Sequence, residues 1–87
     1  MAEVDAVRCL RVLADRDPGV LLRVIERFSN LNIIPNRFNA NCGPDDQIII
    51  EIELTDIPIA TCVLIAAKVA QLPAVLDVRL DGVERTL

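Results

Sequence analysis

Apolar and polar residues repeat with different periods along the chain, and each change of period predicts a new element. In residues 7–14 both sets of alternate positions are mostly apolar, so a strand here would have two apolar faces. This is typical of a strand in the middle of a sheet. A helical stripe follows, consisting of Val20, Leu21, Val24, Ile25, Phe28 and Leu31. Asp17 is expected to cap this helix and Pro18 to begin it, because the fixed φ of proline suits the first helical position. Asn32, in a left-handed conformation, is expected to end it.

The middle of the chain predicts a hairpin. From Asn36 the period is two, so that Phe38, Ala40 and Cys42 face one way and Arg37, Asn39 and Asn41 the other. Pro35 places this strand at an edge of the sheet, since proline cannot donate a ladder hydrogen bond. A turn at Gly43–Asp46 leads into a second alternating strand over Gln47–Leu54. Its inward residues are expected to be Ile48, Ile50, Ile52 and Leu54.

The last third of the chain predicts a helix and a strand. Pro58 introduces a helix that runs to Leu72, and Val75–Leu80 alternates as the last strand before a turn at Asp81–Gly82. The core stripe of this helix is expected to be Ile59, Cys62, Val63, Ala66, Val69 and Ala70. Its remaining surface carries Ile57, Leu64 and Ile65. A helix that is apolar nearly all round is normally buried on more than one side.

Together these elements follow the order β-α-β-β-α-β within one domain over residues 1–87, with a core over about 7–81 and a short frayed start over 1–5. Two right-handed crossovers on one sheet predict an α+β fold, the ferredoxin-like sandwich, with an antiparallel sheet and both helices on one face. The first and third strands are then central, and the second and fourth are the edges.

Net charge and composition exclude several functions. The chain has a net charge of −4 and neither Trp nor Tyr, so it lacks the cationic patch and the stacking residues that nucleic-acid binding uses. It has no apolar stretch of about 18 residues and no basic N-terminal region, so no membrane insertion or export is expected and the cytoplasm is the expected location. Cys9, Cys42 and Cys62 are widely spaced and are expected to be small buried residues in a reducing compartment.

Catalytic chemistry has no candidate residues. His is absent, no glycine-rich phosphate loop occurs, and no Cys or carboxylate cluster has the spacing of a metal site. We therefore expect no enzymatic activity, no metal and no cofactor. The charged positions Arg11, Arg37, Glu51, Glu53, Asp77 and Arg79 have mixed signs and are expected to form cross-strand pairs on a solvated sheet face.

Gly19 is the residue that the helix pattern leaves unexplained. Glycine in a first turn lowers helix propensity and offers no side chain for packing. Either a neighbouring backbone lies too close for a Cβ, or a ligand approaches the helix N-terminus, where N–H groups attract a carboxylate. The sequence leaves both interpretations open.

Two segments resemble the ACT domain family: LRVLADRDPGVLLRVIERFSNLNI, residues 10–33, and QLPAVLDVRL, residues 71–80. The first is similar to the family's opening strand, its Asp-x-Pro-Gly-like turn and its amphipathic helix, and the second is similar to its fourth strand. The resemblance covers roughly residues 7–81. Within the family, the two segments look most like the small regulatory subunits of acetohydroxyacid (acetolactate) synthase.

This resemblance implies a non-catalytic, allosteric module of amino-acid metabolism. Domains of this family commonly pair side by side and bind a small amino acid between the first turn of one copy and the start of the second strand of another. Carried over by position, the ligand-binding residues are Arg16, Asp17, Gly19, Val20, Ile33, Ile34 and Asn36. A homodimer or a larger assembly is expected, also because an 87-residue aliphatic domain is marginal alone.

A second hypothesis is an effector-insensitive small subunit that docks on and activates a biosynthetic enzyme such as acetolactate synthase. Amino-acid-sensing relatives usually carry an asparagine where this chain has Ile34, whose side chain cannot hydrogen-bond a ligand. The apolar excess of the second helix also favours docking.

Overall fold

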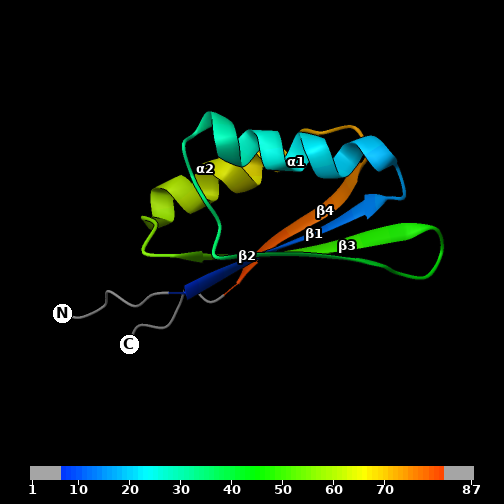
Figure 1. Ribbon diagram of the computed structural model, residues 1–87, viewed down its shortest axis with the longest axis horizontal. Helices are drawn as coiled ribbons and strands as arrows, with labels where there is room; N and C mark the ends of the chain where they lie inside the picture. The colour runs from blue at the N-terminus through cyan, green and yellow to red at the C-terminus, as the bar shows by residue number, and fades with distance from the viewer. Residues whose placement is uncertain (1–6, 82–87) are drawn as a thin grey trace.

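A computed structural model describes residues 7–81, which form a sheet with two helices packed on it (Figure 1). The elements are β1 (Val7–Asp15), α1 (Pro18–Asn30), β2 (Arg37–Cys42), β3 (Gln47–Thr55), α2 (Ile59–Ala70) and β4 (Val75–Asp81). The strands form an antiparallel sheet in the order β2-β3-β1-β4, and both helices cover the same face of it. This is the predicted ferredoxin-like sandwich, with β1 and β3 central. The expected frayed start and the turn at Gly82 lie outside the described residues.

The core lies between the sheet and the helices. In β3 the buried side chains are the four predicted to point inward, Ile48, Ile50, Ile52 and Leu54, and in β1 the buried ones are Leu10, Val12 and Ala14. Val20, Val24 and Phe28 of α1 are buried in the same core as these strand residues. Within residues 7–81 every fully buried side chain is apolar. Burial of aliphatic surface is therefore the main stabilising contribution to this fold.

α1 begins as predicted, at Pro18 behind an Asp17 cap. Asp17 has an extended backbone, and its carboxylate accepts a hydrogen bond from the N–H of Gly19 at 3.0 Å. Pro18 has no N–H to satisfy at this position. The two residues together define the start of the helix.

Replacing Asp17 with alanine should lower the free energy of unfolding by about 0.5–2 kcal/mol, because the N–H of Gly19 loses its acceptor. Urea melts would measure the difference. Asp17→Asn keeps an acceptor oxygen and should retain most of the stability. Equal stability of wild type and Asp17→Ala would contradict the role of the cap.

α1 ends in a Schellman motif that fixes the loop after it. Asn32 has a φ of 57°, the left-handed conformation predicted for it. The N–H of Asn32 donates to the carbonyl of Ser29 at 3.0 Å, and the N–H of Ile33 donates to the carbonyl of Phe28 at 2.9 Å. The chain therefore leaves the helix along a fixed path, with the Ile33 side chain in the core.

The prediction for α2 is only partly right about the buried face: Cys62 and Val69 are buried as predicted, and Ala66 packs against the core. The side chains that reach the core are Cys62, Ile65 and Val69, so Ile65 belongs to the core and not to the surface. Ile59 and Val63, both predicted in the core, are 42% and 54% exposed, and Ala70 is exposed as well. When a helix is apolar on all sides, periodicity cannot identify its buried face, because only contact with the sheet distinguishes one face from another.

The ends of α2 are less sharply defined than those of α1. Pro58 precedes the first helical residue, and no side chain caps the helix there. The helix ends at Ala70, two residues before the predicted end at Leu72. The predicted boundaries therefore hold to within two residues.

The two edges of the sheet differ. β2 pairs with β3 in continuous register from Arg37 to Cys42. β4 pairs with β1 with a register shift, since Leu13 lies opposite Asp77 but Ala14 lies opposite Val75, which leaves Leu76 as an extra residue. Such a bulge disrupts the regular backbone spacing that another strand would need. In the described sheet, the β2 edge is therefore the one suited to pairing.

Candidate functional site

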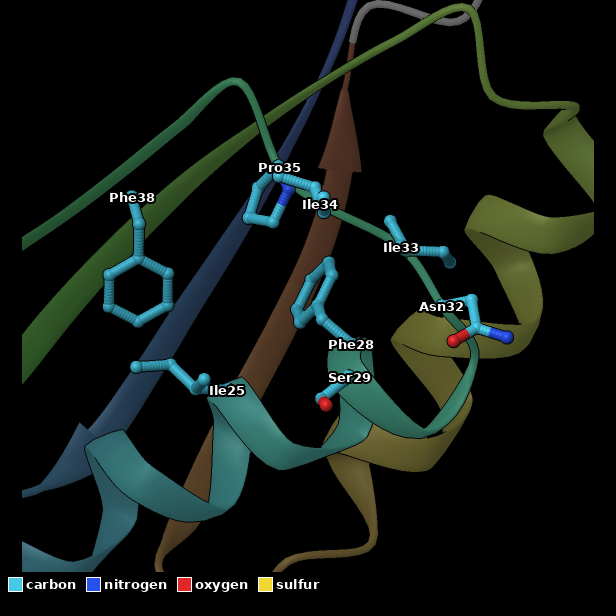
Figure 2. A pocket seen from close by; sticks show the side chains of 8 residues that line it. All are labelled: Ile25, Phe28, Ser29, Asn32, Ile33, Ile34, Pro35 and Phe38. Carbon is cyan, nitrogen blue, oxygen red and sulfur yellow. The ribbon is translucent and has the colours of Figure 1, made fainter.

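A groove of about 360 Å³ opens beside the β2 edge, between α1, the loop that follows it and β2 (Figure 2). Its lining consists of Ile25, Phe28, Ser29, Asn32, Ile33, Ile34, Pro35 and Phe38. Ile25 of α1 and Phe38 of β2 point toward each other across it. Only Ser29 and Asn32 are polar, so the groove is suited to an apolar group.

The rim of the groove exposes large apolar side chains. Ile34 is 88% exposed and Ile25 is 46% exposed. Ile25 belongs to the predicted apolar stripe of this helix and lies at its border, on the side where β2 is the last strand of the sheet. Leu22, three residues earlier on α1, is 60% exposed. We call Leu22, Ile25, Ile34 and Phe38 the β2-edge surface.

The predicted ligand-binding residues form two groups at opposite ends of α1. Arg16, Asp17, Gly19 and Val20 lie at its start, whereas Ile33, Ile34 and Asn36 follow its end. The helix has 13 residues and is about 20 Å long, so its two ends lie far apart. A single copy of the chain therefore does not bring the two groups together.

Arg16 lies against the tip of the β2–β3 hairpin. Its backbone N–H donates to the carbonyl of Asp46 at 3.0 Å, and its Nη1 lies 3.7 Å from the Asp46 carboxylate. The Arg16 side chain is 50% exposed and that of Asp46 is 90% exposed. An ion pair this long and this exposed contributes little to stability, so the Arg16 guanidinium is available to bind another anion.

The N–H groups of the first turn of α1 are already bonded. Gly19 donates to the Asp17 carboxylate, and Val20 donates to the Asp17 carbonyl at 2.9 Å. The side chain of Val20 is 1% exposed and belongs to the core. A ligand carboxylate at this helix end would therefore compete with the Asp17 cap.

The space beside Gly19 is occupied by Arg23. A Cβ on Gly19 would lie 3.0 Å from Nη1 of Arg23, and its nearest neighbours are all side-chain atoms. The interpretation that a neighbouring backbone excludes a side chain is therefore wrong. Helical side chains point toward the N-terminus, which brings a residue over the one four positions earlier. That spacing is the signal by which the sequence could have predicted this neighbour.

Gly19→Ala should leave the free energy of unfolding unchanged or raise it by up to about 1 kcal/mol. Alanine favours the helix, and the flexible, exposed Arg23 side chain can move by the few tenths of an ångström that a methyl group needs. Urea melts would measure the change. A loss of stability above about 1 kcal/mol would mean that the first turn is packed more tightly than this geometry indicates.

At the other end of α1, Asn36 faces the sheet instead of the groove. Its backbone N–H donates to the carbonyl of Glu53, and its Nδ2 donates to Oγ1 of Thr55, both at 2.8 Å. Ile33 and Ile34 do line the groove. The sequence interpretation missed the other lining residues, namely Ile25, Phe28, Ser29, Asn32, Pro35 and Phe38. For Ile25 the signal is an apolar residue at the border of a helical stripe that is followed by an edge strand.

The sheet face opposite the helices carries the mixed charges. Arg11 bonds Glu51 across strands at 2.8 Å, as predicted. Arg79 bonds Asp77 at 3.2 Å within β4, so this pair is not cross-strand. Across residues 7–81, no three His, Cys, Asp or Glu side chains are grouped so that they could hold a metal ion. Neither helix of that part of the chain is long and apolar enough to cross a membrane.

The three cysteines have different surroundings. Cys62 is buried, Cys9 is partly buried and Cys42 is exposed, so the prediction of burial is wrong for Cys42, the last residue of the edge strand β2. Burial raises the pKa of the Cys62 thiol. Burial and the nearby carboxylates of Glu51 and Asp81 raise the pKa of the Cys9 thiol. Both thiols are therefore poor nucleophiles near neutral pH, because the thiolate is the reactive form.

Comparison with known proteins gives a family and a set of similar folds. The family model of the ACT-like domain matches residues 2–87. The C-terminal domain of the MgtC protein from Mycobacterium tuberculosis superposes with a TM-score of 0.73 at 19% identity, covering 98% of this chain and 95% of that one. The ACT domain from the GTP pyrophosphokinase of Chlorobium tepidum gives a TM-score of 0.75 at 12% identity, covering 88% and 99%.

A third similar structure is a homoserine dehydrogenase from Thiobacillus denitrificans, with a TM-score of 0.67 at 24% identity. It covers 88% of this chain but only 17% of the enzyme, so the likeness is to one small part of that protein. No curated protein matches the chain. At these identities the likeness to solved structures concerns the fold alone.

Proposed function

Because the chain belongs to the family of ACT-like domains, we propose that it is a regulatory module that binds a small amino acid where two copies meet along β2. ACT domains are in general small, non-catalytic regulatory modules that bind amino acids. The observation that carries the proposal is the apolar groove beside the regular β2 edge.

Pairing along β2 follows from the chemistry of that edge. One side of β2 is bonded to β3, and the backbone groups on its other side face outward as the last strand of the described sheet. Antiparallel pairing of two β2 strands would join two sheets and satisfy those groups. The same contact would cover Leu22, Ile25 and Ile34, whose exposure is otherwise unfavourable.

A two-fold axis at β2 also sets the α1 helices of the two copies antiparallel, because α1 lies beside β2 and shares the groove with it. The start of one α1 then approaches the end of the other. Arg16 of one copy would come beside Ile33 and Ile34 of its partner, although within one chain these residues lie at opposite ends of a helix about 20 Å long. The pair thereby assembles a site that one copy lacks.

The groove and the turn would share the recognition of the ligand. Arg16, with its loosely paired guanidinium, would bind the carboxylate of an amino acid. The groove would bind the side chain, and its lining favours an aliphatic or aromatic one. The proposed effector is therefore an amino acid with an apolar side chain.

A thermal-shift panel of amino acids, followed by calorimetry, tests this function. Apolar amino acids should raise the melting temperature, with about 2.7 kcal/mol of stabilisation at 100 times Kd. Arg16→Gln should weaken their binding about 10- to 100-fold through loss of a charge-assisted bond. Arg79→Gln, on the sheet face opposite the helices, removes an equal charge and should leave binding unchanged. If charged amino acids gave the largest shift, or if none gave a shift, the proposal would be wrong.

A second candidate function is an effector-insensitive small subunit that docks on and activates a biosynthetic enzyme such as acetolactate synthase. The specific observation that favours it is the first turn of α1, where the N–H of Gly19 is already bonded to the Asp17 carboxylate. Ile34 offers no hydrogen bond on the other side. Activation of a purified acetolactate synthase catalytic subunit, with no amino acid shifting the melt, would favour this candidate over the first. For either function we propose that the chain acts in the cytoplasm.

A further inference from the structure

Every exposed residue of α2 is apolar. These residues are Ile59, Ala60, Val63, Leu64, Ala67 and Ala70. At 100° per residue, Ala60, Val63, Leu64 and Ala67 lie opposite the buried side of the helix. We call these four residues the α2 ridge. Both helices lie on one side of the sheet, so the ridge faces away from it (Figure 1). The outer face of a surface helix is normally polar, which indicates that the ridge is a contact surface.

We propose that the α2 ridge is an interface with a second copy of this chain, in which the two α2 helices pack antiparallel across a two-fold axis between Val63 and Leu64. The ridge has the same pattern in both directions, a small residue at each end and two large ones in the middle. A two-fold contact requires such self-complementarity. Ala60 would face the partner subunit's Ala67, and the small alanines let the helices approach closely.

Charge at the ridge itself does not oppose a second copy. α2 carries one charged residue, Lys68, and the ridge carries none. The chain as a whole has a net charge of −4, so two copies repel each other wherever charged surfaces meet. Antiparallel packing brings the N-terminus of each α2, which no side chain caps, beside the C-terminus of the other, where the partial charge is opposite.

The size of the ridge determines the strength of the contact. A helix of 12 residues is about 18 Å long, and contact along it falls short of the roughly 800 Å² per partner that a stable interface buries. The ridge alone would therefore give weak, concentration-dependent pairing. It shares no residue with the β2-edge surface, so both contacts can form at once. Together they would build a dimer of dimers.

Disulfide cross-linking tests the geometry directly. In a Cys42→Ser background, Leu64→Cys places a thiol next to its own counterpart at the two-fold axis. Ala70→Cys places one on the same helix with a counterpart about 20 Å away. Mild oxidation should link Leu64→Cys into dimers and leave Ala70→Cys largely monomeric on a denaturing gel. Equal cross-linking of the two variants, or none in either, would overturn the proposal. Each outcome is independent of the β2 contact.

Sedimentation velocity over a concentration series gives a second readout. Leu64→Lys should weaken the highest association step by at least 10-fold, although it brings the net charge closer to zero, because two lysines meet at the axis. Leu76→Lys makes the same change at an exposed leucine of β4, outside the ridge, and should leave that step unchanged. An unchanged association of Leu64→Lys would show that the ridge does not contact a second copy.

Discussion

Ile65→Ala should lower the free energy of unfolding by about 2–5 kcal/mol, the range for truncating a large aliphatic side chain in a well-packed core. Ile65 has no exposed surface, and it lies at the centre of the α2 face that covers the sheet. Removing three carbon atoms there leaves a cavity that the neighbouring elements cannot close. A domain of 87 residues has little stability in reserve, so the variant should be largely unfolded at physiological temperature.

Leu64→Ala is the matched control for this change. Leu64 is 45% exposed, and its replacement should alter the free energy of unfolding by less than about 0.5 kcal/mol when measured at low protein concentration. Urea melts of both variants, monitored by circular dichroism, would give the comparison. Similar losses in the two variants would mean that the buried face of α2 has been wrongly assigned.

Ile34→Asp should weaken pairing along β2 by at least about 100-fold while leaving the fold intact. The side chain is 88% exposed in one copy, so a carboxylate costs nothing there. In the proposed pair the same position lies in an apolar interface, where an unpaired charge costs several kcal/mol. Effector binding should be lost together with pairing, since neither copy has a complete site.

Sedimentation equilibrium and the thermal-shift panel would measure these two losses. Asn30→Asp is the control, because Asn30 is exposed on α1 but lies on the side of α2, beside Lys68. It should pair and bind like the wild type. A dimeric Ile34→Asp variant would show that copies do not meet at the β2-edge surface. A monomeric variant that still binds an apolar amino acid would place the whole ligand site within one copy.

Elements with local signals were the ones that the sequence predicted well. The start of α1 needs only the chemistry of Asp17 and Pro18, and its end needs only the tolerance of Asn32 for a positive φ. The alternation of β3 likewise separates its two faces without reference to any other part of the chain. Because each of these signals lies within a few residues, a single sequence is enough to find them.

The sequence did not predict the features that depend on contacts between residues far apart in the chain. Nothing local distinguishes Ile65 from Leu64, and only the packing of α2 on the sheet buries one and exposes the other. The groove is formed by a helix, a loop and a strand, so Phe38 enters it only once the sheet order is known. In each case the missing information is three-dimensional proximity.

The extra residue in β4 limits how far this sheet can grow. A domain with two regular edges can add copies without end and form a fibre, which is a recurrent hazard for edge strands. Here two β2 edges can meet, and the new sheet then ends on both sides in a strand that is interrupted at Leu76. In the proposed pair, growth of the sheet would therefore stop at two copies. The interruption at Leu76 would then protect a chain that is 53% hydrophobic from polymerising through its backbone.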